Sequence, residues 1–175
     1  MVNPWVSHLE ARKRILRYVL STLKYGLFYK KNENFVLSGF VDSDWADDVN
    51  DRRSTTAYCF TMGSAAISWC SKKQPNVALS ITEVKYYDAT MAVQECIWLK
   101  MLISHVYGKV DYPISVKCDK ESAVKLASNA LFYARTKHIE VHHHFIREKV
   151  LIQEIELMSI WTNDQVPDVF TKALS

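Results

Sequence analysis

Apolar residues recur every three or four positions in residues 4–24 and again in residues 80–105, and this spacing predicts two amphipathic helices. Gly26 and Gly108 follow these stretches and are suited to end the helices. Ser80 is a candidate cap at the start of the second one. The pattern therefore predicts one helix at the start of the chain and a longer one near its middle.

Shorter apolar runs bounded by polar turns predict strands. They occupy residues 27–29, 35–41, 55–62, 65–71, 114–118 and 155–161. Gly63 and Ser64 separate the third and fourth runs, which indicates a hairpin. Further helices are expected at residues 123–127, 136–152 and 164–174. Strands that first follow one another and then alternate with helices indicate an α/β fold.

The composition is that of one globular domain. The chain has 175 residues, of which 49% are hydrophobic and 23% charged, so it can bury a sizeable core and is neither disordered nor fibrous. No apolar run approaches the roughly 20 residues that span a bilayer, so we expect no membrane partner. The four cysteines show no CxxC spacing, so we expect reduced thiols and a cytoplasmic or nuclear protein.

Positive charge is concentrated at the start of the chain. Residues 1–31 contain seven Lys and Arg and one acid, a net of +6, and because the whole chain is +3 the remainder is −3. We therefore expect residues 1–31 to form a basic helix and strand that precede the main domain, residues 32–175. Arg12, Lys13 and Arg17 could follow a phosphate backbone, or they form a solvated face of a helix whose apolar side packs on the domain.

Three aspartates occupy comparable places in this layout. Asp42 and Asp119 each follow a predicted strand, and Asp168 lies in the last predicted helix. Strand ends converge in α/β sheets, and a carboxylate cluster is what two Mg²⁺ ions need to hydrolyse a phosphodiester. Acids that end strands are also ordinary turn residues, so the spacing leaves both interpretations open.

Six runs of the sequence are distinctive when taken together. They are VDSDWADD (41–48), DRRSTTAY (51–58), AISWCSKKQPNVALSITE (66–83), VKCDKESAVKLASN (116–129), RTKHIEVHHHFIREKV (135–150) and NDQVPDVFTKAL (163–174). These runs resemble the ribonuclease H domain that ends the Pol polyprotein of copia-type retrotransposons. The leading segment, residues 8–29, is similar to the one that joins reverse transcriptase to ribonuclease H in that family, whereas the polymerase's catalytic motif is absent from the sequence.

The resemblance implies a ribonuclease H-like fold, with a five-stranded mixed sheet of three antiparallel and then two parallel strands flanked by helices. It implies an endonuclease that cleaves the RNA strand of RNA/DNA hybrids with Mg²⁺ or Mn²⁺. It also implies two partners, the hybrid itself and the reverse transcriptase domain of the same polyprotein.

The family's catalytic carboxylates come in the order Asp, Glu, Asp, Asp, which assigns metal binding to Asp42, Asp119 and Asp168, with Asp44 as the second choice for the first position. The Glu lies in a TEAEY-like stretch, which here reads TEVKY (82–86). Lys85 therefore stands at the position of the catalytic Glu.

Helix geometry independently places Lys85 on the inward side of its predicted helix, because it lies 4 residues from Ala89, 7 from Ala92 and 11 from Cys96. Glu83 is about 200° further round the helix and cannot replace it. Three aspartates and one lysine sum to −2 instead of the −4 of four carboxylates. An ammonium about 5 Å from a Mg²⁺ repels it by roughly 6 to 7 kcal/mol at an effective dielectric near 20.

This substitution leaves three hypotheses open. The chain is a nuclease with impaired cleavage, a weak single-metal nuclease in which the Lys85 ammonium stabilises developing phosphate charge, or a catalytically inactive, decayed or domesticated module that binds a hybrid or a protein. Lys72 and Lys73, after a predicted strand, either contact the hybrid or belong to a solvated turn. Four tryptophans are expected in or near the core, namely Trp45, Trp69, Trp98 and Trp161.

Overall fold

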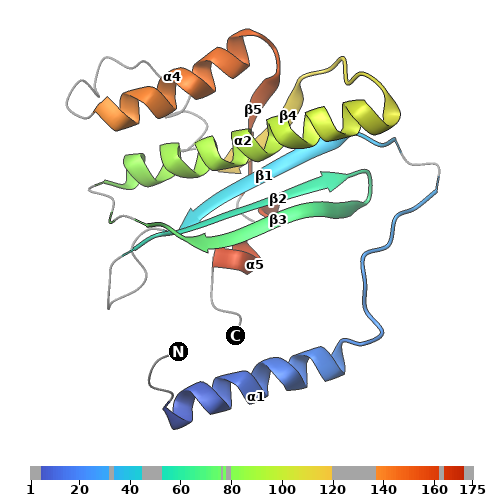
Figure 1. Ribbon diagram of the computed structural model, residues 1–175, viewed down its shortest axis with the longest axis vertical. Helices are drawn as coiled ribbons and strands as arrows, with labels where there is room; N and C mark the ends of the chain where they lie inside the picture. Colours follow the sequence, from blue (N-terminus) through green and yellow to red (C-terminus); the bar gives the residue numbers. More distant parts are fainter. Residues whose placement is uncertain are drawn as a thin grey trace.

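The chain folds around one five-stranded mixed sheet (Figure 1). The structure is a computed structural model that describes residues 5–31, 34–44, 53–75, 77, 80–119, 137–161 and 164–171. The strands, in the spatial order β3-β2-β1-β4-β5, are β1 (Leu37–Asp44), β2 (Thr55–Met62), β3 (Ala65–Lys73), β4 (Ile114–Asp119) and β5 (Ile155–Ile160). β1, β2 and β3 pair antiparallel, whereas β4 runs parallel to both β1 and β5. The predicted fold class and strand arrangement are confirmed.

Helices cover both faces of this sheet. The long helix α2 (Ile81–Tyr107) and α4 (Lys137–Leu151) lie on one face, and the short helix α5 (Asp168–Thr171) lies on the other (Figure 1). Ser80 caps α2, because its side-chain oxygen accepts a hydrogen bond from the backbone N–H of Glu83 at 3.2 Å. Gly108 ends the helix with φ at 101°, a left-handed conformation that favours glycine.

The core lies between α2 and the sheet. Ala89, Ala92 and Cys96 follow one stripe of the helix and are almost completely buried, as the spacing predicts. They pack with apolar side chains of the central strands, including Val41 and Val116. This packing fixes the orientation of α2, and therefore the direction in which Lys85, four residues before Ala89, projects.

Gly39 allows β1 and β2 to pack closely. It pairs with Phe60 in the antiparallel ladder, and a Cβ added at Gly39 would lie 2.5 Å from the nearest carbon of the Phe60 ring. Because Phe60 is completely buried, the ring occupies the space that any larger residue would need. Gly39 therefore sets the position of the strand that leads to Asp42.

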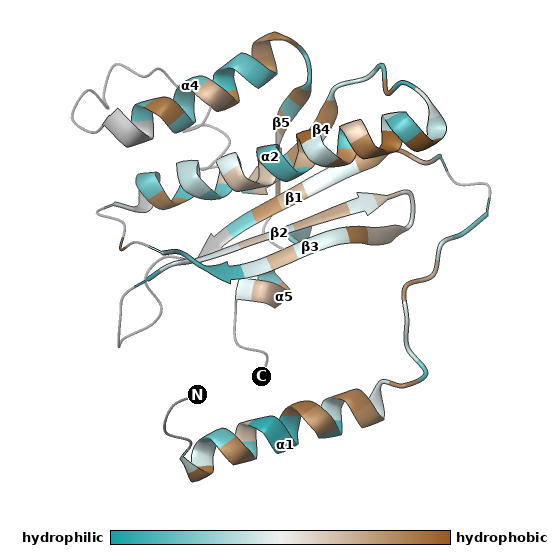
Figure 2. Ribbon diagram, viewed as in Figure 1, coloured by the Kyte–Doolittle hydropathy of each residue, from teal (hydrophilic) through white to brown (hydrophobic). Residues whose placement is uncertain are grey.

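The first predicted helix is confirmed as α1 (Val6–Ser21), but it packs differently from the sheet helices. None of its residues is buried, and it lies apart from the sheet (Figure 1). Figure 2 shows hydrophobic and hydrophilic bands alternating along it. On the helical wheel Leu9, Leu16 and Leu20 share one face, which is exposed in this structure.

The strand predicted at residues 27–29 is wrong. This segment contacts the β2–β3 turn and the start of β3 through hydrogen bonds that involve side chains instead of a backbone ladder. The Tyr29 hydroxyl donates to the carbonyl of Ala66 at 2.6 Å, and the backbone N–H of Lys30 donates to the Ser64 hydroxyl at 3.0 Å. Side-chain contacts to a turn hold the segment in place without the regular pairing that defines a strand.

The last predicted helix is shorter than expected at its start. Residues 164–167 precede α5, and the helix begins only after Pro167, where the Asp168 N–H donates to the carbonyl of Gln165 at 3.3 Å. A proline without an N–H is tolerated immediately before or at the first helical position, which explains this start. Residues 172–174 and the helix predicted at 123–127 lie outside the described residues.

The expectation that the tryptophans lie in or near the core is also wrong for the three that the structure describes. Trp69, Trp98 and Trp161 are 56%, 52% and 83% exposed. Trp69 lies on the edge strand β3, and Trp98 lies on α2 away from the buried stripe that Cys96 and Leu99 follow. Trp45 lies outside the described residues.

Candidate active site at the ends of β1 and β4

The two central strands bring Asp42 and Asp119 to the same end of the sheet. β1 and β4 are parallel neighbours, and their ladder pairs Phe40 with Lys117. Asp42 and Asp119 each lie two residues beyond this pair, and neighbouring strands are about 4.8 Å apart. Two carboxylates from distant parts of the sequence therefore lie at adjacent strand ends.

The turn of α5 lies against the first of these carboxylates. The Thr171 hydroxyl donates a hydrogen bond to Oδ2 of Asp42 at 2.8 Å and also lies 3.3 Å from the carbonyl oxygen of Asp168. Gln165, which is 7% exposed, donates from Nε2 to the carbonyl of Val41 at 2.9 Å. These contacts place the start of α5, and with it Asp168, beside the end of β1.

Sequence reasoning missed Thr171 and Gln165. Both lie three residues from Asp168, within the run NDQVPDVFTKAL. Their hydrogen bonds cross 129 and 124 residues of sequence. The only available signal was their presence in the same distinctive run as Asp168.

Lys85 reaches the second carboxylate from α2. Its Nζ lies 3.4 Å from Oδ2 of Asp119, and the side chains of the two residues are 11% and 34% exposed. The flanking residues Val84 and Tyr86 are 1% exposed, so the helix turn that carries Lys85 is firmly packed. The Glu83 backbone, in contrast, takes part in the cap of the helix.

The ion pair changes the charge of this region. At 3.4 Å and an effective dielectric near 20, the attraction between Lys85 and Asp119 is about 5 kcal/mol before the cost of desolvation. The three aspartates and Lys85 carry −3 and +1, a formal sum of −2. The ammonium therefore compensates one of the negative charges that would otherwise attract a cation.

The effect of these charges reaches the neighbouring thiol. The pKa of Cys118 is raised to about 12, mainly because the thiol is buried and also because of the charge of Asp119, whereas the Lys85 ammonium opposes the rise. Cys118 directly precedes Asp119 in β4. The buried end of this strand thus contains a thiol that stays protonated at neutral pH.

The described side chains do not form a complete site for a divalent metal. Among the residues that the structure describes, no three His, Cys, Asp or Glu side chains are grouped so that they could hold a metal ion. Mg²⁺ takes oxygen ligands in an octahedral arrangement, whereas an oxygen of Asp119 here faces an ammonium group. The residues thus provide oxygen ligands of the right chemistry but not a complete site.

Two of the predicted basic contacts lie at the same end of the sheet. Asp42 pairs with Ala57, which pairs with Ser71, and Lys72 and Lys73 follow directly on β3. Both lysines are exposed. Because β3 lies two strands away from β1, the backbone of these two lysines is about two strand spacings, roughly 10 Å, from β1.

The basic residues of α1 are exposed but lie on a separate element. Lys13 and Arg17 are one turn apart, about 40° from each other on the helical wheel. Arg12 is about 100° from Lys13 and lies among the apolar residues of the helix. The structure does not bring this helix to the ends of β1 and β4 (Figure 1).

Comparison with known proteins places this arrangement in a family. No family model matches the chain. Its sequence is 41% identical over 172 residues to the retrovirus-related Pol polyprotein from transposon TNT 1-94 of Nicotiana tabacum, covering 98% of this chain and 13% of that protein. It is 38% identical over 175 residues to the Pol polyprotein from transposon RE1 of Arabidopsis thaliana, covering 100% of this chain and 12% of that protein. It is also 46% identical over 106 residues to secreted RxLR effector protein 161 of Plasmopara viticola, covering 61% and 75% of the two chains.

A solved structure shares the fold of this chain. LC11-RNase H1, isolated from compost, superposes with a TM-score of 0.55 at 9% identity and covers 78% of this chain and 92% of its own. This chain belongs to the family of retrotransposon Pol polyproteins, and its fold is of the ribonuclease H type. The domain spans about one eighth of the length of the curated Pol relatives named above.

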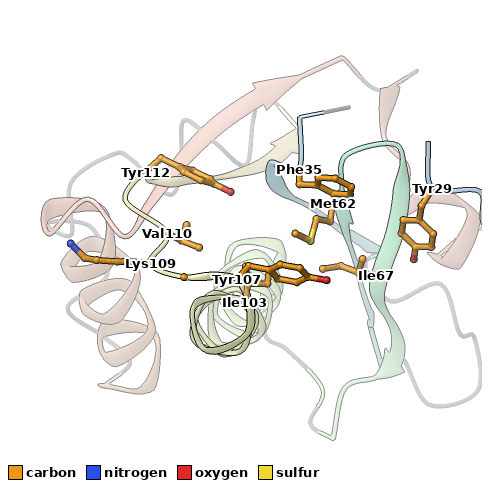
Figure 3. A pocket seen from close by; sticks show the side chains of 10 residues that line it. Tyr29, Phe35, Met62, Ile67, Ile103, Tyr107, Lys109, Val110 and Tyr112 are labelled. Carbon is orange, nitrogen blue, oxygen red and sulfur yellow. The ribbon is translucent and has the colours of Figure 1, made fainter. Parts of the chain in front are cut away.

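A pocket of this ribonuclease H-type domain lies away from the carboxylates. A pocket of about 470 Å³ lies where the end of α2 meets the start of β1, beside Phe35 and Met62 (Figure 3). Ile103 and Tyr107 line it from α2, and Lys109 points away from it (Figure 3). Over the described ranges, no helix has the length and apolar character needed to cross a bilayer.

Proposed function

We propose that this domain, of the copia type, binds RNA/DNA hybrids but cleaves their RNA strand weakly or not at all. The observation that carries the proposal is the 3.4 Å ion pair between Lys85 and Asp119. Metal-assisted hydrolysis in this family requires four carboxylates, and here a lysine occupies the position of the Glu. Asp42, Asp119 and Asp168 are the residues that would bind Mg²⁺ or Mn²⁺ if a fourth carboxylate were restored.

Hybrid binding is supported by charges at the same end of the sheet. Lys72 and Lys73 are exposed there, and each phosphate contact contributes to affinity by releasing counterions. Lys13 and Arg17 on α1 form a second exposed basic face. Protein groups of this kind recognise the backbone and 2′-hydroxyls of a duplex without reading its sequence.

The proposed partners follow from the family. They are an RNA/DNA hybrid and the reverse transcriptase domain of the same polyprotein. The four cysteines are all free in this structure, and the thiols of such a protein persist in the reducing cytoplasm or nucleus, where we place the domain.

The test is cleavage of a labelled RNA/DNA hybrid in Mg²⁺ and in Mn²⁺. We expect the natural chain to show little cleavage and Lys85→Glu to gain at least tenfold, because the substitution removes the ammonium and adds the missing carboxylate. The double variant with Lys85→Glu and Asp42→Asn should lose this gain, which would tie it to the proposed ligands.

A matched control addresses the neighbouring acid. Adding Glu83→Gln to Lys85→Glu should leave the gain intact, because residue 83 lies about 200° away on the helix. Cleavage by the natural chain at the rate of Lys85→Glu would show that the ion pair does not impair the site and would refute the proposal. Loss of activity with Glu83→Gln would instead make Glu83 the ligand.

Binding is measured separately, with a fluorescent hybrid in EDTA at several salt concentrations. Replacing both Lys72 and Lys73 by Ala should weaken binding and lower the salt slope by about 2, roughly one for each phosphate contact. The control is Lys109→Ala, whose side chain is 84% exposed near the opposite end of the sheet. Binding that is unchanged by the double substitution would favour the alternative, an inactive module that binds a protein.

A further inference from the structure

We infer that Lys85 is a permanent internal cation that stabilises the acidic strand ends, so that the folded chain neither requires nor responds to a divalent metal. The inference rests on the proposed function in one respect, since it concerns the same group of side chains. It adds a structural role that cleavage measurements do not report.

The sheet itself creates the need for a positive charge. The register of β1 and β4 brings Asp42 and Asp119 to adjacent strand ends, about 4.8 Å apart from backbone to backbone. Like charges at neighbouring strand positions destabilise a sheet. A compensating group at this end therefore contributes to the stability of the pairing between β1 and β4.

Neutral donors satisfy only part of this need. The Thr171 hydroxyl donates to Asp42 at 2.8 Å, which partly compensates that carboxylate but brings no charge. Lys85 is the group shown to contribute a full positive charge to Asp119, at 3.4 Å. The two aspartates are therefore stabilised from opposite faces of the sheet, by α5 and by α2.

The position of Lys85 is fixed rather than adaptable. Its side chain is only 11% exposed, and the adjacent residues Val84 and Tyr86 are anchored in the core at 1% exposure. A lysine on a surface helix could turn into solvent when a metal ion arrives. This one would have to leave a packed environment, so the ammonium and a divalent cation compete for the same oxygen.

The experiment measures thermal unfolding of the full chain in EDTA and with millimolar MnCl₂, at matched ionic strength. The natural chain should show the same melting temperature in both solutions. Lys85→Glu should melt about 5 °C or more lower in EDTA and recover in MnCl₂, because four carboxylates then repel one another until a cation binds. Mn²⁺ bound to the protein, counted from the loss of the free-ion electron paramagnetic resonance signal, should be detectable for Lys85→Glu and absent for the natural chain.

Lys100→Glu is the matched control. It makes the same change of charge on the same helix, fifteen residues and therefore about 22 Å from Lys85, and should give no metal-dependent recovery. If Lys85→Glu does not fold even in MnCl₂, the neutral variant Lys85→Met tests the inference in its place. It should lose stability in EDTA relative to the natural chain, and by more than Lys100→Met does.

Two results would overturn the inference. One is a natural chain that Mn²⁺ stabilises by several degrees, and the other is a Lys85 variant as stable in EDTA as the natural chain. Failure here is distinct from failure of the proposed function. If the natural chain is inactive but binds Mn²⁺, only the internal-cation role is refuted. If the natural chain is active and its melting temperature is the same with and without metal, only the proposed function is refuted.

Discussion

Replacing Gly39 by Ala tests how closely β1 and β2 pack. The new Cβ would lie 2.5 Å from one Phe60 ring carbon and 3.0 Å from two others, whereas ordinary contacts begin near 3.4 Å. The ring must therefore retreat by about 1 Å, yet Phe60 is fully buried and the ring of Tyr58 lies 5.8 Å away, centroid to centroid. Overpacking of this kind costs about 1 to 3 kcal/mol of the free energy of unfolding.

A double-mutant cycle, measured by urea unfolding, isolates this contact. Phe60→Leu removes buried ring atoms and should cost about 1 to 2 kcal/mol by itself. With the shorter side chain present, the Cβ at position 39 has space, so the two substitutions together should cost at least about 1 kcal/mol less than their sum. Gly26→Ala is the control, since nothing lies within 4 Å of its new Cβ. Additivity within about 0.5 kcal/mol would show that the ring does not limit position 39 and would refute the reasoning.

Two further predictions concern thiols and backbone strain. At pH 8 a disulfide reagent should react rapidly with one thiol per native chain, that of the partly exposed Cys70, and with all four after denaturation. The other three, Cys59, Cys96 and Cys118, are buried, and burial both blocks the access of the reagent and raises the pKa of each thiol. A second thiol that reacts rapidly would contradict this assignment. Gln153→Gly should raise the free energy of unfolding by about 0.5 to 1 kcal/mol, because Gln153 has φ at 56°, where a side chain is strained. The control Gln94→Gly, at an exposed position of α2, should lower the free energy of unfolding by about 1 kcal/mol. A loss of stability in both variants would refute the strain at Gln153.

The regular elements could be predicted because local patterns determine them. The apolar spacing around Ala89 and Cys96 reports both the helix and its buried side, and the β2–β3 hairpin is marked by its turn residues. The same spacing placed Lys85 on the inward side of the helix, and its contact with Asp119 agrees with this placement. The helical spacing of apolar residues therefore predicted both the helix and the side of it on which Lys85 lies.

Features that depend on distant residues could not be predicted in this way. Thr171 bonds to Asp42 across 129 residues, and no local pattern contains that pairing. The exposure of Trp69 depends on β3 being the edge strand, which follows from strand order and not from the strand's own residues. The segment at residues 27–29 has the composition of a strand, but side-chain bonds to a turn took the place of a ladder.

The parallel pairing of β1 with β4 also has a consequence for the time at which the acidic end forms during folding. β2 and β3 join residues that are close in sequence, whereas Ser38 pairs with Ser115, a separation of 77 residues, and Thr171 joins Asp42 later still in the chain. Contacts of long sequence separation form slowly because a large loop must close first. During synthesis, when the N-terminal part of the chain leaves the ribosome first, the β2–β3 hairpin can fold early. Asp42 gains its neighbours only after β4 and α5 have also been synthesised. The acidic end is therefore the last part of the domain to be assembled.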